Sequence, residues 1–219
     1  MFGRLNADGI WQFPPDAAPG PRRPGVLLDR DGVLVKEVHY LRRKEDVVLE
    51  SGVGELLRFL RGNRIPTVVV TNQSGIARGY YDWPAFEIVQ QEIADQLLQE
   101  NCGVDVVLAC PFHPDFTPGY ENRHARWRKP GPGMLKLGAE LLNLDLSRSC
   151  MIGDHVSDIE AAKAAGLPMA IHLMTGHGAR TRAAALRLAD NDFRITISDD
   201  LNQAKQCLAS FFKLPQLGI

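Results

Sequence analysis

The chain has 219 residues, of which 45% are hydrophobic and 23% charged, and its net charge is −1. This composition is ordinary for a globular protein and suits a single α/β domain. The small net charge offers no basic field for nucleic acid, and no apolar run is long enough to span a bilayer. The four cysteines, Cys102, Cys110, Cys150 and Cys207, follow no disulfide-framework spacing, so we expect a reduced, cytoplasmic protein.

Residues 1–25 lack a secretory apolar core and are rich in proline and glycine. We interpret this segment as an irregular arm that lies across the domain through Trp11 and Phe13. Residues 26–219 are then expected to form one domain.

Apolar runs with β propensity alternate with helical patterns along the rest of the chain. In chain order the first half predicts a strand at Val26–Leu28, a helix at Gly52–Leu60, a strand at Thr67–Val70, a helix from an Asp82 cap to about Asn101, and a strand at Val104–Ala109. The second half predicts a helix at Gly133–Leu142, a strand at Ser149–Ile152, a helix at His155–Ala165 ended by Gly166, a strand at Pro168–Leu173, a helix at Ala179–Ala189, an edge strand at Phe193–Ile197 and a helix at Asp199–Phe212. Strands that are apolar on both faces indicate a parallel sheet covered by helices on both sides, a three-layer Rossmann-like α/β fold.

The most informative motif, Asp29-Arg30-Asp31-Gly32, comes directly after the first predicted strand. Side chains alternate along extended backbone, so the carboxylates of Asp29 and Asp31 point roughly the same way. Like charges held this close resist joint ionisation unless a cation or a bound proton compensates. The motif therefore indicates a metal, a proton-transfer pair or both. Ordinary turn chemistry is the alternative when this motif is considered alone.

Three further motifs also follow predicted strands. The turn Thr71-Asn72-Gln73-Ser74-Gly75 offers a hydroxyl, two amides and free backbone N–H groups that can hold an anion. Arg128 and Lys129 end the long loop after the third strand and can place positive charge on a phosphoryl group. Asp154 and Asp158 supply the oxygen ligands that Mg²⁺ prefers. Each motif has an ordinary alternative, namely a helix cap, a solvated basic patch or a carboxylate at a helix dipole, but all four would converge on one crevice.

Together the four motifs resemble those of the haloacid dehalogenase-like phosphatases, over about residues 26–178. The longer strings Thr71–Gly79, Cys110-Pro111 and Arg128–Met134 are similar to the branch that contains the heptose-bisphosphate 7-phosphatases and the histidinol-phosphate phosphatases, and they favour the former. Only a flap and one helix fit between Asp29 and Thr71, so the expected fold is a capless version of this family.

The resemblance implies a phosphomonoester hydrolase that works through an aspartyl-phosphate intermediate. It assigns Asp29 as the nucleophile and Asp31 as the general acid and base. It assigns Thr71 and Lys129 to hold the phosphoryl oxygens and to stabilise charge in the transition state.

The implied cofactor is Mg²⁺. Its implied ligands are Asp29, the carbonyl of Asp31, and Asp154. Asp158 is expected outside the ligand set, where it orients the metal's waters or Lys129.

The implied substrate is a small phosphorylated sugar, and the heptose branch points to the 7-phosphate of D-glycero-D-manno-heptose 1,7-bisphosphate. We expect the loops 36–43, 73–78 and 112–129 to select it. The candidate binding residues are Asn72, Gln73, Ser74, Arg78, Arg128 and Lys129. Histidinol phosphate or another sugar phosphate is the alternative within the branch, and a phospho-aspartate receiver or a silent binding module is the alternative outside it. We expect a monomer without a nucleic-acid or membrane partner.

The branch commonly carries a structural zinc in the loop after the third strand, bound by Cys-x-His and Cys-x-Cys. In this chain Cys110 remains, Phe112 stands at the first histidine position, and Ala125 and Trp127 replace the second pair. The remaining candidates for a metal in this loop are Cys110, His113 and His124. Because four tetrahedral ligands are not available without recruiting His124, we expect no structural zinc and a loop held by packing of Phe112 and Trp127.

Overall fold

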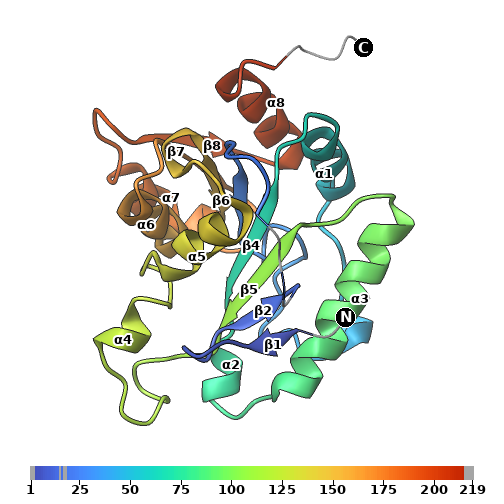
Figure 1. The fold of residues 1–219 in the computed structure, drawn as a ribbon, viewed down its shortest axis with the longest axis vertical. Helices are drawn as coiled ribbons and strands as arrows, with labels where there is room; N and C mark the ends of the chain where they lie inside the picture. The colour runs from blue at the N-terminus through green and yellow to red at the C-terminus, as the bar shows by residue number, and fades with distance from the viewer. Residues whose placement is uncertain (1–2, 15, 17–18, 215–219) are drawn as a thin grey trace.

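The computed structural model describes residues 3–14, 16 and 19–214, and the strands of these residues form one mixed sheet (Figure 1). Along the sheet the order is β1 (Arg4–Leu5), β2 (Trp11–Phe13), β5 (Val106–Cys110), β4 (Thr67–Asn72), β3 (Val26–Leu28), β6 (Cys150–Gly153), β7 (Met169–Leu173) and β8 (Arg194–Ser198). The six strands from β5 to β8 run parallel, as predicted. The first two strands are antiparallel additions that the sequence did not predict.

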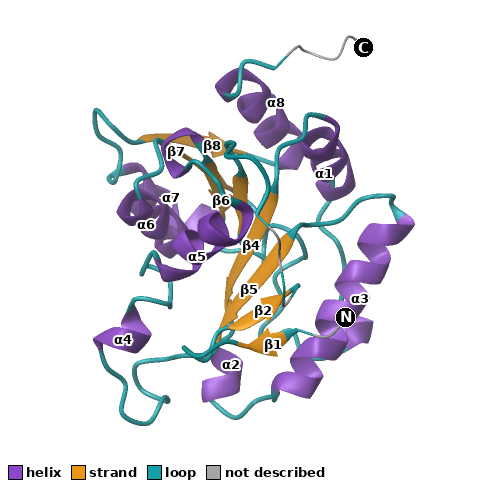
Figure 2. Ribbon diagram, viewed as in Figure 1, coloured by secondary structure: helices purple, strands orange, loops and turns teal. Residues whose placement is uncertain are grey.

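Helices cover both faces of the sheet, which confirms the three-layer α/β fold (Figure 2). One face packs against α1 (Val53–Gly62), α3 (Trp83–Gln99) and α8 (Leu201–Phe211), and the other packs against α5 (Gly133–Leu142), α6 (Val156–Ala165) and α7 (Gly178–Leu186). The short segments α2 (Ser74–Ala77), α4 (Asn122–Ala125), η1 (Lys44–Asp46) and η2 (Leu146–Arg148) lie in connections. Val26 and Leu28 belong to the first core and Leu27 to the second, so this strand is apolar on both faces.

Helix ends follow the capping signals of the sequence. The Asp82 carboxylate accepts the N–H of Ala85 at 3.0 Å and starts α3. Gly166 takes the left-handed conformation, with φ of 83°, and ends α6. One boundary matters for the site: β4 runs two residues beyond the predicted strand, so Thr71 and Asn72 are strand residues with fixed backbone.

The prediction of an irregular arm over residues 1–25 is wrong for two short segments, which form β1 and β2. Strand β2 pairs antiparallel with β5, and Trp11 lies opposite Ala109. The Trp11 ring is buried, meets the Phe86 ring edge-on at 5.1 Å, and donates from Nε1 to Glu87 at 2.9 Å. The expected docking through this tryptophan is thus confirmed. The hairpin covers the edge of β5, which would otherwise be open.

The chain order places a crevice at the centre of the sheet. From β3 the chain adds β4 and β5 on one side, and later β6, β7 and β8 on the other. The strand order therefore reverses between β3 and β6, and such a switch point is where parallel sheets bind ligands. Residues 29–129 are all described and contain no inserted domain, in agreement with a capless fold. Among the described helices, none is both long and apolar enough to cross a membrane.

We predict that Trp11→Ala lowers the free energy of unfolding by about 3–5 kcal/mol, because it empties a buried aromatic site and removes the side chain that anchors the hairpin over β5. Urea denaturation of both proteins measures the change. Leu5→Ala, in the exposed strand β1 of the same hairpin, is the matched control and should change stability by about 0.5 kcal/mol or less. An equal effect of the two substitutions would contradict the assignment of Trp11 as the anchor.

Candidate active site

A cavity of about 350 Å³ lies at the carboxyl ends of β3, β4 and β6, and most of the predicted site residues line it. The predicted residues that line it are Asp29, Asp31, Thr71, Asn72, Gln73, Ser74, Arg128, Lys129 and Asp154. Asp158 lies beneath the cavity and is fully buried. Arg78 does not line the cavity. The four strand-end motifs therefore meet in space, as their positions in the sequence predict.

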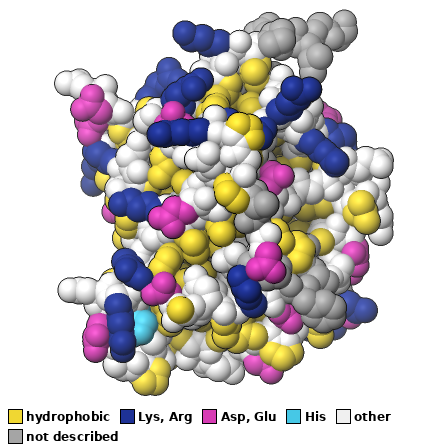
Figure 3. All heavy atoms as spheres, viewed as in Figure 1, with side chains coloured by type: hydrophobic (Ala, Val, Ile, Leu, Met, Phe, Trp, Pro, Cys, Tyr) yellow, Lys and Arg dark blue, Asp and Glu magenta, His cyan; other side chains and the backbone are white. Residues whose placement is uncertain are grey.

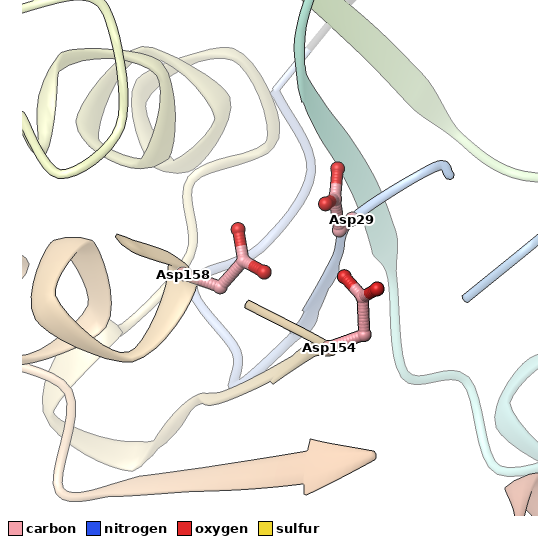
Figure 4. Close-up of side chains that lie close together, drawn as sticks. All are labelled: Asp29, Asp154 and Asp158. Carbon is pink, nitrogen blue, oxygen red and sulfur yellow. The ribbon is translucent and has the colours of Figure 1, made fainter. Parts of the chain in front are cut away.

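Three carboxylates gather at the floor of this cavity (Figure 4). Asp29 follows β3, Asp154 follows β6, and Asp158 comes from the first turn of α6. One oxygen of each lies within 4.8 Å of the others, and this is the one group of acidic, His or Cys side chains in the described chain with such spacing. An all-oxygen donor set of this kind suits Mg²⁺ rather than a soft metal.

The ammonium group of Lys129 is buried among these carboxylates. Its Nζ lies 2.8 Å from Asp29 and 2.7 Å from Asp158, and it donates to the Val70 carbonyl at 2.8 Å. Burial alone would lower the pKa of Lys129, but Asp158 and Asp29 outweigh it and hold this pKa above its usual value. The lysine is therefore a permanent positive charge next to the predicted nucleophile. Its contact with Asp158 agrees with the orienting role expected for that carboxylate.

Burial and mutual repulsion perturb the carboxylates strongly. Burial raises the pKa of Asp29 well above its usual value, and although Lys129 opposes the shift, Asp158 and Asp154 add to it. Burial and then Asp158 raise the pKa of Asp154 to about 7. Three carboxylates share one lysine, so the cluster needs a further cation to be fully ionised. The residues present therefore fit a divalent metal.

The loop after β7 fixes the orientation of Asp154. The backbone N–H of His177 donates to its carboxylate at 2.7 Å, and the Thr175 hydroxyl ties the loop to the Gly32 carbonyl at 2.5 Å. Gly32 and Gly176 have φ of 80° and 48°, and a Cβ on either would collide with the Asp154 carboxylate. This loop was not singled out in the sequence, although it also follows a strand.

The side chains of Asn72 and Gln73, predicted to bind substrate, bond to the protein itself. The Asn72 amide accepts the N–H of Lys129 and donates to the Lys129 carbonyl, both at 3.0 Å. The Gln73 amide donates to Asp31 at 3.0 Å and to Thr71 at 2.7 Å. Both residues line the cavity, but their side chains hold catalytic candidates in place.

The two predicted substrate-binding arginines are placed differently. Arg128 lines the cavity and donates to the Phe112 carbonyl at 3.2 Å. Arg78 instead lies 2.9 Å from the His113 ring nitrogen and stacks 4.1 Å from the Phe116 ring. These contacts direct the Arg78 guanidinium into the loop after β5, so in this structure it is not available to a ligand in the cavity.

Several other cavity residues were not assigned an individual role from the sequence, although five of them lie in the loop 36–43 that was expected to select substrate. They are Arg30, Glu37, Val38, His39, Tyr40, Leu41, Tyr81, His155, Ser157 and His177. Glu37 is one of the residues of the loop 36–43. Burial and then Asp31 raise the pKa of its carboxyl to about 7. His177 lies 3.9 Å from Glu37. Asp29 was identified because it is a polar residue after the end of a strand. His177 also follows a strand, β7, so the same signal points to its loop.

The loop after β5 is held by packing, as expected. Trp127 is buried in the second core, and Phe112 packs against that core and against the His124 ring at 4.7 Å. A ring nitrogen of His124 accepts the N–H of Glu121 at 3.1 Å, and both ring nitrogens of His113 lie within hydrogen-bond distance of protein donors. Burial raises the pKa of the Cys110 thiol to about 12. The expectation that this loop binds no zinc stays a prediction.

Comparison with known proteins agrees with this site. The model of the family "HAD-hyrolase-like" matches residues 126–204. A D-glycero-beta-D-manno-heptose-1,7-bisphosphate 7-phosphatase of Mesorhizobium japonicum is 40% identical over 147 residues, which cover 67% of this chain and 68% of that protein. A D-glycero-D-manno-heptose-1,7-bisphosphate 7-phosphatase of Thermosynechococcus vestitus is 37% identical over 194 residues, which cover 86% of this chain and 96% of that protein.

A solved structure shares the fold over most of the chain. It is the D,D-heptose 1,7-bisphosphate phosphatase from B. bronchiseptica, complexed with magnesium and phosphate. It superimposes with a TM-score of 0.74 at 27% identity and covers 85% of this chain and 98% of its own. Sequence similarity, fold and the meeting of four motifs at one cavity lead to the same conclusion: the chain belongs to the haloacid dehalogenase-like hydrolases, in the branch of the D-glycero-D-manno-heptose-1,7-bisphosphate 7-phosphatases.

Proposed function

We propose that this protein is a Mg²⁺-dependent phosphomonoesterase that removes the 7-phosphate of D-glycero-D-manno-heptose 1,7-bisphosphate. The observation that carries the proposal is Asp29, which stands in a buried cluster beside Lys129 and faces the cavity. The names of the relatives supply the substrate. Inorganic phosphate release from both anomers of this bisphosphate, compared with histidinol phosphate and fructose 1,6-bisphosphate, tests it.

In the proposed reaction an Asp29 oxygen attacks phosphorus in line and forms an aspartyl phosphate, while the bond to the sugar oxygen breaks. Asp31 gives its proton to that oxygen as the sugar leaves. A water then attacks phosphorus while Asp31 takes its proton, and the bond from phosphorus to the Asp29 oxygen breaks. Inorganic phosphate leaves, and the enzyme returns to its starting state. Lys129 and the Thr71 hydroxyl stabilise the charge on the phosphoryl oxygens.

The metal would be held by Asp29, Asp154 and the backbone carbonyl of Asp31. When bound, Mg²⁺ offsets the repulsion between the nucleophilic carboxylate and the phosphate. Within the chain, Asp158 keeps Lys129 in place through their 2.7 Å ion pair. The N–H of His177 holds one oxygen of Asp154 and so leaves the other for the metal.

Substrate selection is assigned to the residues around the mouth of the cavity. Arg128 is proposed to bind the second phosphate, because it lines the cavity next to Lys129 in the chain and its hydrogen bond to the Phe112 carbonyl uses only one guanidinium nitrogen, Nη1. The four cysteine thiols are free, which supports a cytoplasmic setting.

We predict that Asp29→Asn abolishes phosphate release from sugar and aryl phosphates alike, because an amide is a poor nucleophile and a weaker metal ligand. Steady-state assays measure the loss, and circular dichroism checks that the fold is intact. Asp192→Asn, at an exposed carboxylate far along the chain, is the control and should keep full activity. A near-normal rate of phosphate release by Asp29→Asn would contradict the assignment of Asp29 as the nucleophile.

We predict that Arg128→Ala lowers kcat/KM for the heptose bisphosphate by about tenfold to a hundredfold, the equivalent of one charge-assisted bond to phosphate. The same variant should change kcat/KM for p-nitrophenyl phosphate by less than about threefold, since that substrate has no second phosphate. Arg126→Ala is the matched control, because Arg126 pairs with Asp8 and lies outside the cavity. Equal losses on both substrates would instead assign Arg128 to the reacting phosphate or to the loop.

We predict that, in EDTA, the melting temperature falls as the pH rises from about 4 to 7. The folded protein binds protons at Asp154 with a pKa of about 7, against 3.8 for an ordinary aspartate, so the stability present at low pH is lost as this carboxyl ionises. Asp154→Asn should reduce the slope, and millimolar Mg²⁺ should restore stability at pH 7 to the wild type but not to the variant. Differential scanning fluorimetry measures both effects. A slope unchanged by the substitution would contradict the burial of an uncompensated charge.

A further inference from the structure

The proposed reaction leaves one buried arginine without a role. Arg30 stands between the two catalytic aspartates in the sequence and is 1% exposed. Its guanidinium lies 5.4 Å from the Phe86 ring centre, on the helix-covered side of the sheet that holds α3. Burial of a guanidinium in such surroundings is costly unless hydrogen bonds compensate for the lost water. The partners of Arg30 therefore indicate what it is for.

Arg30 directs its hydrogen bonds to a single carboxylate. Its Nε donates to both oxygens of Asp31, at 3.2 and 3.1 Å, and its Nη2 donates to Oδ1 at 2.9 Å. This fork fixes the plane of the carboxylate as well as its position, which a lysine cannot do. The remaining nitrogen, Nη1, is buried without a hydrogen-bond partner among the described residues.

A second group of side chains, from the segment between β4 and α3, holds the same carboxylate. The Gln73 amide donates to Oδ2 of Asp31 at 3.0 Å. The hydroxyl of Tyr81 donates to the Gln73 oxygen at 2.5 Å, which turns the amide nitrogen toward Asp31. Burial raises the pKa of Tyr81 to about 12, so its hydroxyl remains a donor at neutral pH.

The carboxylate that these groups hold is the one assigned to proton transfer. The Asp31 side chain is 21% exposed and lines the cavity beside Asp29 and Lys129. A general acid works only within hydrogen-bond reach of the leaving oxygen, and a displacement of about 1 Å can cost about 100-fold in rate. We propose that Arg30, together with the Gln73–Tyr81 pair, is a positioning group that fixes the Asp31 carboxyl for proton transfer to and from the leaving oxygen. This inference rests on the proposed phosphatase function.

The test compares Arg30→Lys and Tyr81→Phe on two leaving groups. Arg30→Lys keeps the charge and loses the fork, and Tyr81→Phe keeps the ring and loses the hydroxyl that orients Gln73. Tyr80→Phe is the matched control, because Tyr80 is the exposed neighbour, contacts the Tyr40 ring and has no hydrogen bond to Asp31. Single-turnover rates are measured with the heptose bisphosphate, and the burst of nitrophenolate is measured with p-nitrophenyl phosphate.

We expect Arg30→Lys to lower the rate of hydrolysis of the sugar bisphosphate by about 10- to 100-fold, and Tyr81→Phe to lower it by about 3- to 10-fold. KM should be nearly unchanged in both variants. The nitrophenolate burst should change by less than about threefold in both, because a good leaving group needs little acid assistance. Tyr80→Phe should match the wild type on both substrates. Equal losses on the two substrates, or no loss on the sugar, would overturn the positioning role.

A double-mutant cycle identifies the residue through which Arg30 acts. In an Asp31→Asn enzyme, Arg30→Lys should have no further effect on the sugar rate, whereas a separate structural effect would multiply the two losses. If Asp31→Asn slows hydrolysis of the sugar bisphosphate more than that of p-nitrophenyl phosphate and Arg30→Lys does not, the positioning role fails and the proposed function stands. If Asp31→Asn slows neither substrate, or the wild type hydrolyses no phosphomonoester, both fail.

Discussion

The site depends on a buried charge imbalance at the carboxyl ends of β3 and β6. Three carboxylates, from Asp29, Asp154 and Asp158, face one ammonium group, that of Lys129. Two negative charges are left over when all are ionised, and burial makes that excess costly. Protonation can relieve it, as the raised pKa values of Asp29 and Asp154 show, and so can a divalent cation. The same imbalance therefore creates the metal site and prepares a place for a phosphoryl group beside it.

The fold keeps these like charges together by attaching them to strands that the core fixes. Strand β3 lies between β4 and β6, and its three residues are buried on both faces, so the position of Asp29 is set by two cores at once. The close approach of backbone to Asp154 then needs residues without a Cβ, which is why Gly32 and Gly176 flank it. Rigid attachment prevents the carboxylates from relieving their repulsion by moving apart.

The parallel sheet and the meeting of the candidate catalytic residues at one cavity could be predicted because they depend on local patterns: an apolar run, then a polar group at the strand end. What could not be predicted depends on contacts between distant segments. Strand β2 is three residues long and is defined by its pairing with β1 and with β5, the latter about a hundred residues away. Arg78 belongs to the string Thr71–Gly79 that resembles the heptose branch and was predicted to bind substrate, yet its guanidinium contacts His113 and Phe116. Side-chain amides and guanidinium groups choose partners in space, which sequence spacing does not determine.

Catalysis and substrate selection are thus built differently in this molecule. The acidic floor belongs to strand ends, whereas the mouth of the cavity is formed by the loop 36–43 and the loops after β5 and β7. On the face of the molecule drawn in Figure 3, acidic and basic side chains are interspersed. Without a cap, the part of the substrate remote from the reacting phosphate meets only these loops. Arg128 supplies positive charge there, and Glu37 opposes it. Because the pKa of Glu37 is raised to about 7, this carboxyl carries only part of a charge at neutral pH and resists a second phosphate less than an ordinary glutamate would. Under the proposed function, this smaller charge makes the mouth a better match for a bisphosphate than the number of acidic residues around it suggests.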